Sequence, residues 1–114
     1  MKEIMQQTLA APIAYSGIGL HSGKEVANEI IAGKREYGYC FVRTDLSGHP
    51  EIQALAENVS STVKATTVSE NGTEVFTVEH LMAAFSMMGI DNCRIEMSAP
   101  EPPVTEAVLL YFVS

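Results

Sequence analysis

The residues best suited to chemistry in this sequence are an adjacent glutamate and histidine, Glu79 and His80, within FTVEHLMAAFSMMGIDN. A histidine can hold zinc, and a neighbouring carboxylate can take a proton from the attacking water, so the pair supplies two parts of a zinc-dependent hydrolase. A catalytic zinc centre needs three protein ligands, however, and the chain has only three histidines, at positions 21, 49 and 80. On spacing alone, an acidic residue beside an ordinary histidine in the first turn of a helix is the simpler interpretation.

Two further segments offer groups that bind ligands. His21 lies in the glycine-punctuated segment GIGLHSG, residues 17–23, where a tight turn would present it toward a pocket or toward solvent. Turn chemistry alone favours a hairpin turn with a solvated histidine. The stretch SSTVKATTVS, residues 60–69, offers hydroxyl groups, but a strand with an exposed polar face explains it equally well.

The Glu79-His80 pair begins the most convincing helix in the chain, which we expect from about Val78 to Met88. Thr77 suits the N-cap position, and Gly89 is a stop signal. Helical periodicity places Val78, Leu81, Met82, Phe85 and Met88 on one face. The other side bears His80, Ala83, Ala84 and Met87, with Glu79 and Ser86 at its flank. A helix that is apolar nearly all round is normally covered on both sides, which predicts a partner surface for this one.

Short runs of strand-forming residues, bounded by turn residues, make up most of the remaining chain. The expected strands are Ile4–Leu9, Ile13–Ser16, Glu25–Ile31, Tyr37–Val42, Val63–Ser69, Thr73–Phe76 and Asn92–Met97. Asn71-Gly72 predicts a two-residue hairpin turn, residues 43–52 are expected to form a loop, and residues 104–114 a strand or a second helix. This order predicts an α+β domain, with a mostly antiparallel sheet packed against one or two helices.

Length and composition limit the classes of function. The 114 residues correspond to a single domain, and 46% apolar with 18% charged residues is typical of a globular protein. The net charge of −7 and the lack of a basic cluster exclude a nucleic-acid partner from our expectations. No apolar run suits a signal peptide or a membrane span, so we expect a cytoplasmic protein. Cys40 and Cys93 lie in apolar, strand-like runs and are expected as buried free thiols.

Four segments, in this order and spacing, resemble the N-terminal domain of the UDP-3-O-acyl-N-acetylglucosamine deacetylases, which are zinc amidohydrolases of lipid A biosynthesis. The segments are GIGLHSG, FVRTDL, ENVSSTVKATTV and TVEHLMAAFSMMGIDNCRIEMSAPEPPV. The resemblance runs from roughly Gln6 to Val104, which is nearly the whole chain. Each motif alone is a weak signal, whereas the combination of GLHSG, TVEHL and GIDN is specific.

The resemblance implies roles for three residues. His80 would be a zinc ligand, Glu79 the general base for the attacking water, and His21 a residue near the substrate, UDP-3-O-acyl-N-acetylglucosamine. Residues 43–60 would form a small insert beside the active site. The resemblance also implies that this chain is one half of a two-domain fold with the active site between the halves. The other two zinc ligands, in a His-Lys-x-x-x-Asp motif, belong to the second domain, as do the catalytic histidine and threonine.

The resemblance leads us to expect a single domain, residues 1–114, without the second domain, that binds zinc weakly and is inactive alone. Two alternatives remain: a non-catalytic binding module derived from the same family, or a truncated gene product with no separate function. After the proline segment the family reads Asp-Gly-Ser, whereas this chain reads TEAVLL, residues 105–110, so the helix start is lost. The outer helix face, which the second domain would cover, is expected to support self-association when left open.

Overall fold

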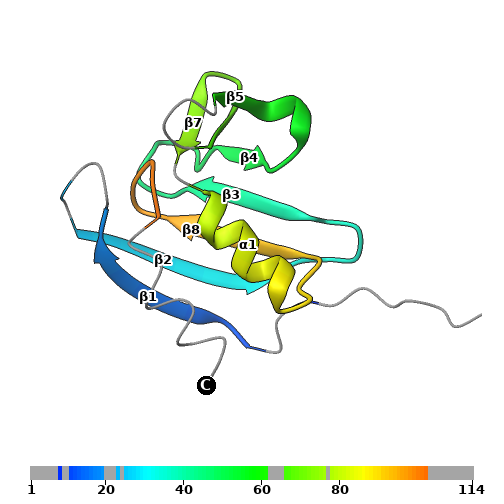
Figure 1. Cartoon of the computed structure of the whole chain (residues 1–114). Helices are drawn as coiled ribbons and strands as arrows, with labels where there is room; N and C mark the ends of the chain where they lie inside the picture. The colour runs from blue at the N-terminus through cyan, green and yellow to red at the C-terminus, as the bar shows by residue number, and fades with distance from the viewer. Residues whose placement is uncertain are drawn as a thin grey trace, which may run out of the picture.

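Five strands form the main sheet, and a helix lies across one face of it in the computed structural model (Figure 1). The structure describes residues 8, 11–19, 23, 25–61, 66–76 and 78–102. Across the main sheet the strands are β1 (Ile13–Ile18), β2 (Glu25–Ala32), β8 (Cys93–Met97), β3 (Tyr39–Arg43) and β4 (Glu51–Gln53). A smaller sheet contains β5 (Val59–Ser61), β6 (Thr67–Glu70) and β7 (Thr73–Phe76). The described helices are a 3-10 turn (Ala56–Asn58) and α1 (Glu79–Met87).

Neighbouring strands of both sheets run antiparallel, apart from the parallel pair β3 and β8. A parallel pair needs a crossover connection, and here the crossover contains β4, the small sheet and α1. The expected α+β architecture, a mostly antiparallel sheet packed against a helix, is therefore confirmed.

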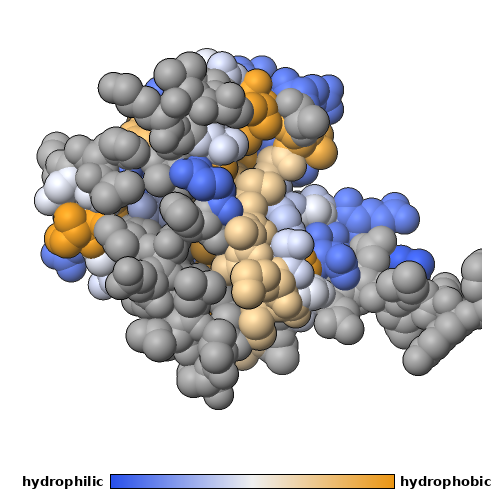
Figure 2. Space-filling view, in the orientation of Figure 1, coloured by the Kyte–Doolittle hydropathy of each residue, from blue (hydrophilic) through white to orange (hydrophobic). Residues whose placement is uncertain are grey.

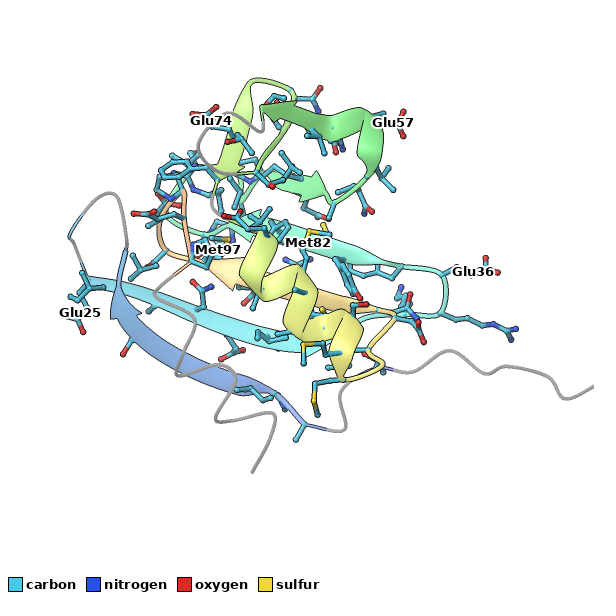
Figure 3. The ribbon with its side chains drawn as sticks, in the orientation of Figure 1. Glu25, Glu36, Glu57, Glu74, Met82 and Met97 are labelled. Atoms are coloured by element: carbon cyan, nitrogen blue, oxygen red, sulfur yellow. The ribbon has the colours of Figure 1, made fainter. Side chains whose placement is uncertain are left out.

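The hydrophobic core lies between α1 and the main sheet. Side chains alternate along β8, so that Cys93, Ile95 and Met97 are buried while Arg94 and Glu96 are half-buried on the other face. Phe41 lies opposite Ile95 in the β3–β8 register and joins the same core. From the helix, this core receives Val78, Leu81 and Phe85, with Met82 packed at its margin; Met82 and Met97 are labelled in Figure 3.

The C-terminal end of α1 explains the GIDN motif. Gly89 has a φ of 71°, its N–H donates to Ser86 O at 3.2 Å, and the N–H of Ile90 donates to Phe85 O at 2.9 Å. These two bonds form a Schellman motif, in which a left-handed residue turns the chain away from the helix. The side chain of Asn92 then accepts a hydrogen bond from Gly38 N–H at 2.8 Å, which fixes the β2–β3 loop against the start of β8. The expected stop at Gly89 is confirmed.

Two residues of the expected helix lie on a different side from the one expected. Ala84 is buried although the periodicity placed it on the outer side, and Met88 is exposed although it was placed in the core. Seen down the helix axis, the buried face of the helix is centred nearer to Leu81 than to Phe85. Ala84 therefore lies on the buried face. Met88 is the C-cap, where the chain already turns away from the sheet. The helix begins at Glu79, and the expected N-cap, Thr77, lies outside the described residues.

Several expected strands differ from the observed ones at their ends. Residues 43–52 are not wholly a loop, because Ile52 of β4 pairs with Phe41 and is buried. The Ser/Thr-rich stretch begins in β5 and ends in β6, and its residues 62–65 lie outside the described part. The hairpin at Asn71-Gly72 is confirmed, with φ of 52° and 80°, as a two-residue turn with both central residues left-handed requires. The expected strand Ile4–Leu9, apart from Thr8, and residues 104–114 also lie outside the described part.

Both cysteines are buried, free thiols, as expected from their apolar surroundings. Burial raises the pKa of the Cys93 thiol to about 12, and burial is also the main cause of the raised pKa of Cys40. Both thiols are therefore protonated at neutral pH. In the described part of the chain, the one α-helix has nine residues, too few to traverse a bilayer.

Candidate active site at the start of helix α1

Glu79 and His80 are the first two residues of α1, whose start faces the small sheet (Figure 1). The N-cap residue is Val78, whose apolar side chain cannot cap the helix. Burial of Val78 and Leu81 in the core fixes the first turn instead. The Val78 N–H also donates to Thr66 O at 3.4 Å, a long hydrogen bond to the residue before β6.

The carboxylate of Glu79 is tied to the same residue. Thr66 N–H donates to Glu79 Oε2 at 3.1 Å, and the Glu79 side chain is half-buried. Thr66 therefore contacts the first turn of α1 through both of its main-chain polar groups. A glutamate held in this way presents its carboxylate near the helix start, where the sequence analysis placed the general base.

The structure describes the backbone of His80 but not its side chain, and His21 lies outside the described residues. The assignment of His80 as a zinc ligand and of His21 as a substrate residue therefore stays a prediction. His49, the third histidine, is exposed in the β3–β4 loop with a φ of 47°. This φ angle is typical of a turn, and we assign His49 no role.

A zinc centre needs several ligand side chains grouped around one point. Among the described side chains, no three His, Cys, Asp or Glu residues are grouped so that they could hold a metal ion. The chemistry of one corner nevertheless fits, because imidazole is a common zinc ligand and the carboxylate of Glu79 suits a proton acceptor. Glu79 and His80 are thus of residue types that suit part of a zinc site, and their roles in such a site stay a prediction.

The RTD part of the second motif has a structural role. The Arg43 guanidinium donates two hydrogen bonds to Asp45, Nε to Oδ1 at 2.9 Å and Nη2 to Oδ2 at 2.8 Å, and a third to Glu74 O at 3.1 Å. The hydrogen bond from Arg43 is the main reason why the pKa of Asp45 is lowered. Because Glu74 belongs to β7, this contact ties the small sheet to the end of β3.

The ENV motif closes the junction between the two sheets from the other side. Asn58 Nδ2 donates to Gln53 O at 2.8 Å and to Glu70 Oε1 at 3.0 Å. The same Glu70 oxygen accepts from Gln53 N–H at 3.1 Å. The expected insert, residues 43–60, thus contains β4, the 3-10 turn and the beginning of β5, and is held to β6 by a glutamate that the sequence analysis did not single out.

The described outer side of α1 is partly apolar. Met87 is 80% exposed, and Ala83 and Ser86 are exposed beside it. In Figure 2 an apolar strip follows α1 along this face of the molecule. Its composition agrees with the predicted cover by a partner surface, and the partner itself stays a prediction.

Comparison with known proteins agrees with the motif-based resemblance. A family model described as UDP-3-O-acyl N-acetylglycosamine deacetylase matches residues 6–114. The deacetylase of Geotalea uraniireducens is 44% identical over 108 residues, 95% of this chain and 35% of the relative. That of Thermosynechococcus vestitus is 48% identical over 101 residues, covering 89% and 35%, respectively. The bifunctional enzyme LpxC/FabZ of Bacteroides thetaiotaomicron is 41% identical over 110 residues, covering 96% and 24%.

The chain spans about a quarter to a third of the length of these curated relatives. The family model covers almost all of the chain, including every motif on which the resemblance depends. The chain therefore belongs to the UDP-3-O-acyl N-acetylglycosamine deacetylase family.

Proposed function

We propose that this chain supplies the Glu79-His80 corner of a zinc-dependent UDP-3-O-acyl-N-acetylglucosamine deacetylase that acts in the cytoplasm. The reaction is hydrolysis of the acetamide of the sugar nucleotide, which releases acetate and leaves a free amine. The observation that carries the proposal is the first turn of α1, where a glutamate held by Thr66 is followed directly by a histidine. Membership of the family supplies the substrate class.

Each residue has a separate role in this proposal. Zinc, when bound, supplies a Lewis acid that activates both the water and the acetamide carbonyl. His80 is one of its protein ligands. Glu79 takes the proton from the attacking water as the new C–O bond forms, and the C–N bond then breaks as the amine gains a proton. His21 is a residue that would lie near the bound sugar nucleotide.

We further propose that the chain is inactive on its own. One histidine ligand is too few for a catalytic zinc centre, which needs three protein ligands. The remaining ligands and the proton donor for the amine would come from a second domain of the family. This domain would cover the apolar outer side of α1, including Met87.

A reconstitution experiment tests these assignments. The purified chain is mixed with the C-terminal portion of the Geotalea uraniireducens deacetylase, and acetate release from UDP-3-O-acyl-N-acetylglucosamine is measured with and without zinc. We expect turnover from the zinc-loaded mixture and none from the chain alone. His80→Ala and Glu79→Gln should each reduce kcat by at least about 10²-fold. A general base usually contributes about 10²–10⁴-fold to the rate.

Glu29→Gln is the matched control, because Glu29 is exposed on β2, on the sheet face away from α1, and should not affect turnover. Catalytic acetate release by the chain alone would contradict the inactivity. Turnover that is indifferent to His80→Ala would reject the ligand assignment. A mixture that binds the sugar nucleotide without releasing acetate would favour the non-catalytic binding module.

A further inference from the structure

The small sheet holds a main-chain donor against the glutamate of the candidate site. Thr66 immediately precedes β6, and its N–H donates to Glu79 Oε2 at 3.1 Å. Its carbonyl accepts from Val78 N–H at 3.4 Å, so the two contacts surround the junction at which α1 begins. The N-cap residue, Val78, makes no side-chain hydrogen bond at this end of the helix.

The donor is itself firmly placed. The next residue, Thr67, pairs with Phe76 across the β6–β7 ladder, and Phe76 N–H donates to Pro100 O at 2.8 Å. Arg43 ties β7 to the end of β3 through Glu74 O. Thr66 therefore adjoins a strand pair whose second strand, β7, is hydrogen-bonded both to Pro100 after β8 and to Arg43 at the end of β3.

A glutamate has three rotatable side-chain bonds, and a base that rotates freely spends little time in the productive orientation. A hydrogen bond to a carboxylate is stronger than one between neutral groups, so a single main-chain N–H can hold one rotamer. Because Oε2 accepts the hydrogen bond from Thr66, Oε1 is the oxygen that would take the proton from water.

We propose that the main chain of Thr66 is the positioning element for Glu79, and that presenting its N–H is a function of the small sheet. The inference depends on the proposed role of Glu79 as the general base. The donor is a main-chain group, so the threonine hydroxyl is not required. Thr66→Val keeps the N–H and should behave as wild type, whereas an ester in place of the amide at residue 66 removes the N–H and keeps the threonine side chain.

The hydrogen bond can be tested in the chain without any activity. In a ¹⁵N-labelled sample, Glu79→Ala should shift the Thr66 amide proton upfield and speed its hydrogen exchange about tenfold or more, as loss of a bond to a charged group predicts. Thr66→Val should leave both properties close to those of wild type. An amide signal at residue 66 that does not respond to Glu79→Ala would overturn the proposal, whatever the activity.

The consequence for catalysis is tested in the reconstituted deacetylase. The ester variant should lower kcat by about 10–100-fold with KM within twofold, because a misplaced catalytic group slows the chemical step and leaves substrate binding intact. Thr66→Val should keep the wild-type kcat. An ester variant with the wild-type kcat would overturn the positioning role. Absence of turnover in the wild-type mixture refutes the proposed function instead, and the amide signal then decides whether Thr66 holds Glu79.

Discussion

Truncation of Phe85 to alanine should release α1 from the sheet and so disturb the segment that bears the candidate site. Phe85 is fully buried, and its ring lies 5.1 Å from that of Tyr39 with an interplanar angle of 48°. The hydroxyl of Tyr39 in turn donates to Ile90 O at 2.6 Å, just after the helix ends. Phe85 is therefore at the centre of the contact between α1 and β3.

The expected loss of stability follows from this burial. Phe→Ala in a core costs about 3–5 kcal/mol, because the lost transfer energy and the cavity add up. The aromatic pair accounts for about 0.5–1.5 kcal/mol of such a loss. We expect about 4 kcal/mol for Phe85→Ala, a large fraction of the roughly 5–15 kcal/mol that stabilises an ordinary domain.

The assay is urea denaturation followed by circular dichroism at neutral pH. Met87→Ala is the control on the same helix, because the 80% exposed Met87 side chain should contribute about 0.5 kcal/mol or less. Phe85→Leu, which refills most of the cavity, should fall between the two. A loss for Phe85→Ala below about 1 kcal/mol, or equal to that of Met87→Ala, would refute the packing of α1 through this face.

Three further predictions concern the rest of the fold. Gly33→Ala should lower stability by about 1–3 kcal/mol, because its Cβ would lie 2.8 Å from Cys93 N, and an unchanged urea midpoint would contradict this close approach. Arg43 lowers the pKa of Asp45, so this carboxylate stabilises the fold above its unfolded pKa of about 3.9 and the benefit is lost as pH falls through the lower folded pKa. The difference in unfolding free energy between wild type and Asp45→Asn should therefore shrink below about pH 4, and a constant difference would exclude the ion pair as its source. For Cys93 the sign is opposite: a folded pKa of about 12 gives full stability below the unfolded pKa of about 8.5, with a loss of up to about 1.4 kcal/mol per pH unit as pH rises above it. Urea midpoints that do not change between pH 8 and 10 would argue against burial of that thiol.

Local signals in the sequence predicted some elements well. The helix at the candidate site, its end at Gly89 and the hairpin at Asn71-Gly72 depend on residues within a few positions of one another. The parallel pairing of β3 with β8 was not predicted, because it joins segments about fifty residues apart and no local pattern encodes it. For the same reason β4 was assigned to a loop, since Ile52 becomes a strand residue only by pairing with Phe41.

The candidate site was predicted from side-chain types and only in part. Glu79 and His80 were found because their residue types are chemically informative, and the family pattern gave them roles. Thr66 could not be found in this way, since its contribution is a main-chain N–H that any residue except proline would supply. Outside the candidate site, the complete burial of Glu101 was not predicted either, because a glutamate between prolines is typical of an exposed turn.

The place of β8 in the sheet has a consequence for synthesis on the ribosome. Within the described residues, β8 is the last strand to be translated, yet it lies in the middle of the main sheet, between β2 and β3. The β1–β2 and β3–β4 hairpins can form as they emerge, but nothing joins them until Cys93–Met97 has left the exit tunnel. Until then the apolar side of α1 has only half of its sheet to cover it. The core of the nascent chain therefore stays partly exposed until late in synthesis. A chaperone would bind the chain during this stage.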